Sequence, residues 1–434
     1  MTSPLILVTG STGYIASRLI PRLLEAGYRV RCLARRPVRL SGRSWAPRVE
    51  IVQGDVTVPS TLDAALEGVH TAYYLIHNMT HGRGYTDLEL DSARAFASAA
   101  AQAGVEHIIY LGGLADPEQH IAPHMRSRIE TGRVLREGKV PVTEFRAGVI
   151  AGSGSISFEM IRFMTELFPV VPGPLWMRNK SQPIAMQNVI DYLLAALTNP
   201  KGRGGVFEIG GPDVASYGDL MLRYARLRGL KRKMLLIPGI PIGFMALGVG
   251  LMTPVPYPIA YALIGGLSAD SVVRHSEAVD VFPEVRLVSF DVAAQEALAK
   301  TQPAHIERVW EDGGRKARSI KHEGCFIDHR ETTIDAEGVG VLHAIREHCR
   351  IRNWSLQVDE GDGQLIACIQ NQAAGSKWIE WRVREAENVA SLTQTVFFCP
   401  RGLPGFLHWY LLYPLHVLGF NSLLKRIAKD SKSQ

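Results

Sequence analysis

The chain has 434 residues, of which 46% are hydrophobic and 21% are charged, a composition typical of a globular protein and not of a disordered one. This length is sufficient for two or three domains with large cores. The net charge of +6 is mild, and no zinc-ligand spacing or basic-aromatic recognition motif accompanies it, so we expect no metal site and no nucleic-acid partner.

The positive charge is unevenly distributed. Between Arg18 and Arg48 there are nine arginines and a single acid, Glu25. Such a segment favours an anionic partner, either a nucleotide phosphate or a lipid surface. A solvated helix face and loop would explain the same pattern equally well.

The cysteines are scattered, odd in number and free of any C-x-x-C spacing, which predicts a reducing compartment without structural disulfides. They are Cys32, Cys325, Cys349, Cys368 and Cys399. No basic segment leads into a long apolar run at the N-terminus, so we expect no secretory signal. A cytoplasmic location follows as the expectation, with a peripheral position at the inner membrane face left open.

The first half alternates strand and helix signals. It begins with the apolar run Leu5–Val8, followed by helical spacing over Ile15–Leu24. This alternation predicts βαβ units and a doubly wound parallel Rossmann sheet, with ligands bound along the carboxyl ends of the strands. The remaining predicted strands are 28–34, 49–53, 71–76, 107–112 and 142–150, and the clearest further helices are 88–102 and 127–135.

The first strand-to-helix turn, "VTGSTGYIAS", predicts a dinucleotide site. Gly10 permits a tight turn, Gly13 lets the backbone approach a pyrophosphate, and Ala16 is small enough for the helix to pack on the sheet. The helix N-terminus then presents free N–H groups to the phosphates. The residues expected to contact the cofactor here are Gly10, Ser11, Thr12, Gly13, Tyr14 and Ile15.

The second strand ends in "CLARRP", where an NAD-preferring site usually carries an acid for the adenosine ribose. Arg35 and Arg36 stand there instead, and a guanidinium can grip a 2′-phosphate, so we expect NADP(H), with NAD(H) left open. One of the two could instead point into solvent. Asp55, followed by Val56 at the end of the third strand, is expected at the adenine, although a turn-forming Asp is the alternative.

Five stretches in this order resemble the extended and atypical short-chain dehydrogenase/reductases: "TGSTGYIA", "GDVT", "RAGVIAGSGS", "PIAMQNVIDYLLAAL" and "FEIGGPDVASYGDLM". The same cofactor fold resembles the NAD(P)-binding accessory subunit of respiratory complex I. The resemblance implies a Rossmann domain over 1–300 whose substrate lobe, mainly 151–300, returns some segments to the first sheet. It also implies cofactor contacts in "YYLIHNM", at Leu75, Ile76 and His77.

The chain departs from these reductases where they carry Tyr-x-x-x-Lys. No tyrosine has a lysine four residues later, and Gly112 and Gly113 stand where a serine is usual. The corresponding helix start reads His124-x-x-x-Arg128. Arg128 could hold ribose hydroxyls but is a poor proton shuttle. His124 could act as a general acid or base, or it could be an exposed first-turn histidine, which we favour.

A long segment of the lobe, 234–269, has no charged side chain and is interrupted by five prolines. Its longest proline-free piece, 242–253, is shorter than the roughly 20 residues that a membrane-spanning helix needs. We expect burial in the lobe or a subunit contact, with a membrane-surface or lipophilic-ligand flap as the alternative.

After a predicted linker at 301–314, the region 315–434 has four strand-like stretches, an inserted helix and a long apolar terminal helix. This order, and "FFCPRGLPGFLHWYLLYPLH" above all, resembles the START-like helix-grip fold, which implies a hydrophobe-binding domain. Leu403–Leu424 lacks Lys, Arg, Asp and Glu, and we expect it to pack over the sheet. The flanking Lys425, Arg426 and Lys429 leave an interfacial membrane anchor as the alternative.

Two functions follow as hypotheses. The first is an NADP(H)-dependent oxidoreductase acting on a small apolar substrate, such as a quinone or a lipid-like carbonyl. The second is a non-catalytic NAD(P)-binding module, structural or redox-sensing, whose C-terminal domain binds a hydrophobe or a partner. The altered Tyr-x-x-x-Lys favours the second, the intact phosphate turn agrees with both, and both leave the oligomeric state open.

Overall fold

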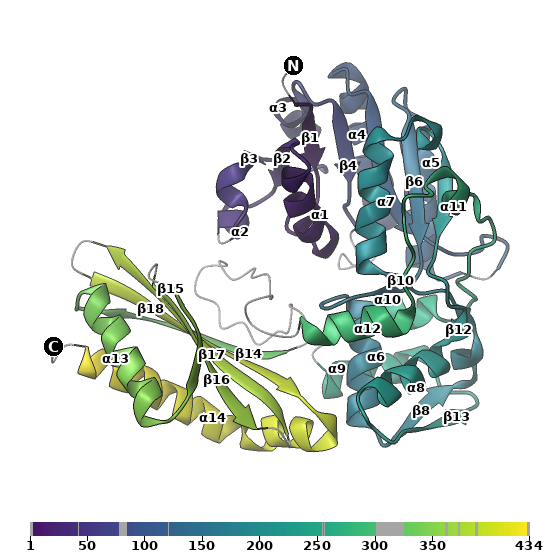
Figure 1. Cartoon of the computed structure of the whole chain (residues 1–434). Helices are drawn as coiled ribbons and strands as arrows, with labels where there is room; N and C mark the ends of the chain where they lie inside the picture. Colours follow the sequence, from purple (N-terminus) through teal and green to yellow (C-terminus); the bar gives the residue numbers. More distant parts are fainter. Residues whose placement is uncertain are drawn as a thin grey trace.

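The structure, a computed structural model, describes residues 3–431 except 42, 78–84, 120, 254, 256, 301–324, 361–362, 372–373 and 387–388. The predicted linker at 301–314 therefore lies outside the described residues. The structure has three parts: a parallel sheet covered by helices, a lobe packed beneath its carboxyl edge, whose segments alternate along the chain with the last elements of the first part, and a C-terminal antiparallel sheet (Figure 1).

The first part is a seven-stranded, wholly parallel sheet with the order β11-β6-β5-β4-β1-β2-β3. This is the Rossmann order, with one strand added by the lobe segment, as the sequence predicted. The strands are β1 (Leu5–Val8), β2 (Arg29–Ala34), β3 (Glu50–Gln53), β4 (Thr71–Tyr74), β5 (His107–Gly113), β6 (Val142–Ala147) and β11 (Val206–Ile209).

Helices cover both faces of this sheet, which accounts for the nearly continuous apolar strands. One face is packed by α1 and α7 in a core that includes Leu19, Tyr73 and Val189, and the other by α3, α4 and α5 in a core that includes Phe96 and Leu135. The helices of this part are α1 (Tyr14–Glu25), α2 (Val38–Ser41), α3 (Leu62–Leu66), α4 (Tyr85–Gln102), α5 (Pro123–Arg136), α7 (Met186–Thr198) and α11 (Glu277–Val281).

The lobe has its own apolar core and three two-stranded pairs, β7 with β10, β9 with β12 and β8 with β13. Its short strands are β7 (Ile150–Ala151), β8 (Val170–Pro174), β9 (Lys180–Ser181), β10 (Ile184–Ala185), β12 (Ala215–Ser216) and β13 (Lys233–Ile237). Its helices are α6 (Ile156–Leu167), α8 (Tyr217–Leu227), α9 (Ile242–Met252), α10 (Tyr257–Gly266) and α12 (Phe290–Ala299).

The uncharged segment 234–269 forms β13, α9 and α10 and is only half buried. Ala246, Val249, Ala260 and Ile264 enter the lobe core, as expected, while other apolar side chains of the two helices are exposed.

The C-terminal part is a five-stranded antiparallel sheet with the order β14-β18-β17-β16-β15. The helices α13 and α14 share a core with one face of it, and that core includes Ile345, Trp381 and Phe420. A helix packed over the sheet is therefore confirmed for α14, whereas the START-like assignment stays a prediction. The elements are β14 (Phe326–Ile334), α13 (Gly338–Ile351), β15 (Ser355–Glu360), β16 (Gln364–Asn371), β17 (Gly375–Ala386), β18 (Val389–Pro400) and α14 (Gly402–Asp430).

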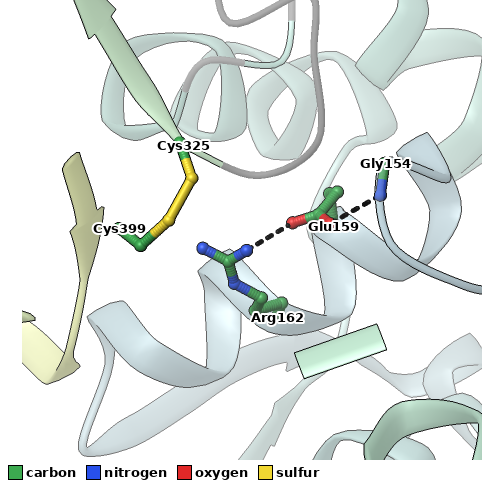
Figure 2. Close-up of a disulfide and its surroundings, with 5 residues drawn as sticks. All are labelled: Gly154, Glu159, Arg162, Cys325 and Cys399. Carbon is green, nitrogen blue, oxygen red and sulfur yellow. Dashed lines mark hydrogen bonds and ion pairs between the residues drawn. A yellow bond between two sulfur atoms is a disulfide. The ribbon is translucent and has the colours of Figure 1, made fainter. Parts of the chain in front are cut away.

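The prediction that no structural disulfide occurs is wrong. A disulfide joins Cys325 and Cys399 (Figure 2). The register of β14 with β18 sets Phe326 opposite Phe398, and the antiparallel ladder therefore brings the two flanking cysteines face to face. The two cysteines are 74 positions apart in the sequence, and no spacing signal could have indicated this pair.

Candidate functional site

The turn between β1 and α1 has the form that a pyrophosphate requires. Gly10 has φ +63°, and a Cβ there would lie 2.8 Å from the carbonyl oxygen of Leu75. The N–H of Gly13 donates to the carbonyl of Gly10 at 2.7 Å, and α1 begins at the next residue. The N-terminus of α1 therefore lies at the carboxyl edge of the sheet, directly after the backbone of Gly13.

Of the other residues predicted at this turn, Tyr14 and Ile15 begin the helix and Thr12 is half buried. Ser11 is buried, and its hydroxyl donates to the carbonyl of Leu33 at 2.9 Å. That hydrogen bond joins the turn to the end of β2. The side chain of Ser11 is therefore used to stabilise the turn, and only its backbone is available to contact a ligand.

Two predicted groups lie further out along the sheet edge. Arg35 and Arg36 follow β2 directly, and both side chains are exposed. Asp55 follows β3, and its Oδ1 accepts from the N–H of Thr57 at 3.0 Å, so the carboxylate has the turn-forming role that was the alternative prediction. Val56 is buried in the core beneath α3.

The segment after β4 runs past the phosphate turn. Thr9 fixes the position of this segment, because the Thr9 hydroxyl donates to the carbonyl of Tyr73 and accepts from the N–H of Leu75. Leu75 and Ile76 then lie beside Gly10, and a contact of theirs with a cofactor stays a prediction. The next residue, His77, is held by a partner that the sequence did not indicate.

That partner is Glu89 on α4, whose side chain is 1% exposed. His77 Nδ1 lies 2.9 Å from Glu89 Oε1, and the Ser127 hydroxyl donates to Glu89 Oε2 at 2.5 Å. Burial works to raise the pKa of Glu89, but the hydrogen bonds from His77 and Ser127 outweigh it and the pKa is lowered. Glu89 is therefore ionised at neutral pH.

Burial lowers the pKa of His77 and outweighs its hydrogen bond to Glu89. The ring is therefore neutral at pH 7, and the carboxylate fixes the tautomer, with the proton on Nδ1. Nε2 then carries a lone pair. It is buried and, among the described residues, has no hydrogen-bond partner.

The expectation that His124 is an exposed first-turn histidine is wrong, because its side chain is 6% exposed. It lies at the start of α5, and α10 covers it: a Cβ on Gly266 would be 3.2 Å from His124 Nε2. Burial lowers the pKa of His124 to about 4, with a further contribution from the charge of Arg128, so the ring is neutral at pH 7.

Arg128 is held at the end of β5. Its Nη2 donates to the carbonyls of Gly112 and Leu111 at 2.9 and 3.2 Å. Gly113, where a serine is usual, lies against the same side chains: a Cβ there would meet the flexible end of Met125 at 2.7 Å and Arg128 Cδ at 3.3 Å. The structure thus brings Arg128 to the predicted edge of the sheet, where a role for it at the ribose stays a prediction.

An apolar cavity of about 30 Å³ lies in the lobe, on the far side of α10 from His124. Ile264 lines it from α10 and Val249 from α9, while the neighbouring Gly266 faces His124. Five methionines contribute to its wall, and such side chains can repack around an apolar guest. They are Met160, Met164, Met177, Met221 and Met245.

Comparison with known proteins places this arrangement in context. The model of the NmrA-like family matches residues 2–202. A (4-alkanoyl-5-oxo-2,5-dihydrofuran-3-yl)methyl phosphate reductase of Streptomyces griseus is 30% identical over 275 residues, which are 60% of this chain and 85% of the relative. A photosystem II assembly factor of Cyanophora paradoxa is 25% identical, over 56% of this chain and 73% of the relative.

A similar fold occurs in the NADPH-dependent quinone oxidoreductase of Escherichia coli, solved in complex with NADPH. The TM-score is 0.55 and the sequence identity 16%, and the match covers 68% of this chain and 99% of the other. The likeness at this identity shows the Rossmann fold.

Proposed function

Since the chain belongs to the NmrA-like family, whose Rossmann fold it has, we propose that it is an NADP(H)-dependent oxidoreductase acting on an apolar substrate such as a quinone or a lipid-like carbonyl. The proposal rests on two features: a phosphate turn followed by His77, a neutral histidine oriented by Glu89, and a methionine-lined cavity in the lobe, which α10 separates from His124.

The residues present fit a dinucleotide. The cradle at Gly10 is closed to any side chain, because a Cβ would lie 2.8 Å from Leu75 O, and the α1 N-terminus faces it. Arg35 and Arg36 are positioned at the end of β2, where the 2′-phosphate of NADP(H) would be held. When bound, this cofactor supplies a hydride.

The chain's own contribution to the chemistry is a proton site and an apolar environment. Glu89 holds the His77 ring, and an ionised Glu89 stabilises the ring once Nε2 takes a proton. Because burial lowers the pKa of His77, the protonated ring gives up its proton readily to a reduced substrate oxygen. Glu89 and Ser127 act through His77 as positioning residues.

Support for an apolar substrate comes from the lining of the cavity. Trp176 and Leu267 line the cavity together with the methionines, and none of its lining residues is charged. The cavity is small as it stands, so we expect the methionines to move when an alkyl or ring substituent enters. The quinone oxidoreductase and the reductase named above support the reaction class by analogy.

Steady-state oxidation of NADPH with quinones and with aldehydes or ketones graded in alkyl length tests the proposal. We expect kcat/KM to rise with alkyl length, since each buried methylene contributes about 0.8 kcal/mol. Met245→Asp should flatten that rise while leaving NADPH affinity unchanged. The proposal would be refuted if the wild-type protein binds NADPH but reduces no member of the series.

The second hypothesis, a non-catalytic module, draws on a separate observation. Arg128 donates to strand carbonyls, and Gly113, which stands where a serine is usual, packs against the Met125 side chain, so the usual reductase groups are absent at this strand end. A photosystem II assembly factor among the relatives fits that reading. Tight NADPH binding without oxidation in the experiment above would favour it.

A further inference from the structure

Large apolar side chains gather on the outer faces of two helices, α9 and α14. On α14 the stripe Leu407, Leu411, Leu415 and Leu418 follows helical spacing, and Leu411 is 71% exposed. The opposite side of α14, which includes Trp409, Phe420 and Leu424, is buried against the sheet. The helix is therefore apolar on both sides, although within the described part of the chain only one side is packed against other elements.

On α9 the exposed stripe consists of Phe244, Leu247 and Leu251, and Phe244 is 69% and Leu251 71% exposed. Its inner face carries Met245 and Val249, which line the cavity. α9 thus separates its exposed outer stripe from the cavity, which is the candidate substrate site.

The two helices adjoin one another although 150 residues separate them in sequence. Tyr410 Oη donates to the carbonyl of Met252 at 3.4 Å, and Met252 packs against the cluster that contains Trp409. Glu166 fixes the start of α14 on the lobe, because its Oε2 accepts from the N–H of Gly402 at 2.6 Å. Figure 1 shows α14 extending along its sheet from the lobe to the C-terminus.

Cations follow the apolar stripe on α14 and precede α9 in the sequence. The stripe on α14 continues with the same spacing to Lys425 and Lys429, beside Arg426, and all three side chains are exposed. Lys231 and Lys233, also exposed, precede the segment that forms α9 and α10. The segments 234–269 and 403–424 contribute no acid.

We propose that the outer faces of α9 and α14 dock this protein on an anionic lipid bilayer. Exposed apolar side chains bordered by lysine and arginine match the acyl boundary and the headgroups of such a surface. A second copy fits less well, because a twofold contact of this face would bring its cations toward those of the partner. No helix in the described part of the chain is both long and apolar enough to cross a membrane, so the contact is interfacial.

Docking in this orientation would place the bilayer against the outer side of the cavity wall on α9. A bilayer-dissolved substrate could then reach the methionine-lined cavity past that helix. This consequence rests on the proposed function, whereas the docking itself depends only on the surface.

Flotation of the full-length protein with vesicles tests the docking without NADPH or turnover, so its outcome is independent of the proposed activity. We expect binding to vesicles of equal parts phosphatidylcholine and phosphatidylglycerol, weakened by salt, and little binding to phosphatidylcholine alone. Leu411→Ser/Leu415→Ser should reduce vesicle affinity at least about tenfold, and Lys425→Glu/Lys429→Glu should abolish the preference for anionic lipid.

The matched control is Val58→Ser/Val279→Ser, which alters exposed valines of the Rossmann part and should leave binding unchanged. Retained NADPH binding and an unchanged circular dichroism spectrum show that a variant is folded. The proposal is overturned if wild-type protein ignores anionic vesicles, or if the control loses as much binding as the leucine variant. It is also overturned if the leucine variant instead abolishes a concentration-dependent dimer.

Discussion

Arg35 and Arg36 decide cofactor preference in this account. The double variant Arg35→Asp/Arg36→Ala should lose about 1.5–3 kcal/mol of NADPH binding, because a charge-assisted pair to phosphate is worth that much. NADH affinity should be nearly unchanged, since NADH has no 2′-phosphate. Titration calorimetry with both nucleotides measures this. An unchanged ratio of the two affinities would mean that the 2′-phosphate is held elsewhere.

His77 should carry the proton chemistry. His77→Ala is expected to lower turnover about 10²–10⁴-fold, the usual contribution of a positioned acid or base, with NADPH affinity preserved. Reduction by the wild type should become faster as the pH falls toward the lowered pKa of His77, because the protonated ring is the donor.

Glu89→Gln is the companion variant. It removes the charge that stabilises the imidazolium while retaining an oxygen for Nδ1–H, so the rising limb of the pH–rate profile should move to lower pH. A profile that does not move would assign Glu89 a purely structural role.

His124 predicts a pH effect on stability. Its pKa is about 4 in the folded protein, against about 6.5 in an unfolded chain. The unfolded state therefore binds the proton first as the pH falls, so the stability contribution is complete above about pH 6.5 and is lost as the pH falls toward 4. His124→Gln should reduce the loss of thermal stability between pH 6.5 and 4, as measured by calorimetry at several pH values. An equally steep loss would contradict the burial of His124.

These residues also show how far sequence reasoning reached. Gly10, Gly13 and Arg35 could be predicted because the phosphate turn and the end of β2 are local patterns. Glu89 and Ser127 could not, because they meet only when α4 and α5 pack together, 38 residues apart. The exposure of His124 was misjudged because the residue that covers it, Gly266, comes from a distant helix.

At the level of elements, six of the seven parallel strands were predictable from apolar runs, whereas β11 was not, and the four strand-like stretches of the C-terminal part contain five strands. The segment 234–269 was not predictable either, because uncharged composition with several prolines does not distinguish a buried wall from an exposed face. The structure shows that α9 is both, with Val249 inside and Leu251 outside. Composition does not show which side of a helix is buried. Helical spacing shows it only once the neighbouring element that packs against the helix is known.

The pairing of β14 with β18 leads to a prediction about thiols. If Cys325 and Cys399 are joined, unfolded protein prepared without reductant should expose three reactive thiols, those of Cys32, Cys349 and Cys368. Reductant should raise the number to the full five. Alkylation followed by mass spectrometry of the peptides counts them, and five thiols without reductant would show that the chain folds with this pair reduced.

For the whole molecule, Glu166 links the lobe to the C-terminal part. Its Oε1 accepts from Tyr224 Oη and Arg228 Nε, and its Oε2 accepts from the N–H of Gly402. Glu166→Leu should destabilise this junction by about 1–3 kcal/mol, because it leaves the buried Tyr224 hydroxyl and the half-buried Arg228 guanidinium without their acceptor. Limited proteolysis should then release the C-terminal part sooner than in Glu166→Gln, which retains one acceptor oxygen. Equal rates in the two variants would show that Glu166 does not hold the two parts together.

One chain combines a nucleotide turn, a neutral histidine, an apolar cavity and a surface bordered by cations. We propose that NADPH held by this chain reduces an apolar substrate. The most direct test is a single-turnover measurement, in which protein saturated with NADPH is mixed with a long-chain quinone and the absorbance of the bound cofactor is followed. We predict rapid, stoichiometric oxidation of bound NADPH that is slowed in His77→Ala. NADPH that stays bound and reduced in the presence of every quinone and carbonyl offered would contradict the claim and favour a non-catalytic nucleotide-binding module.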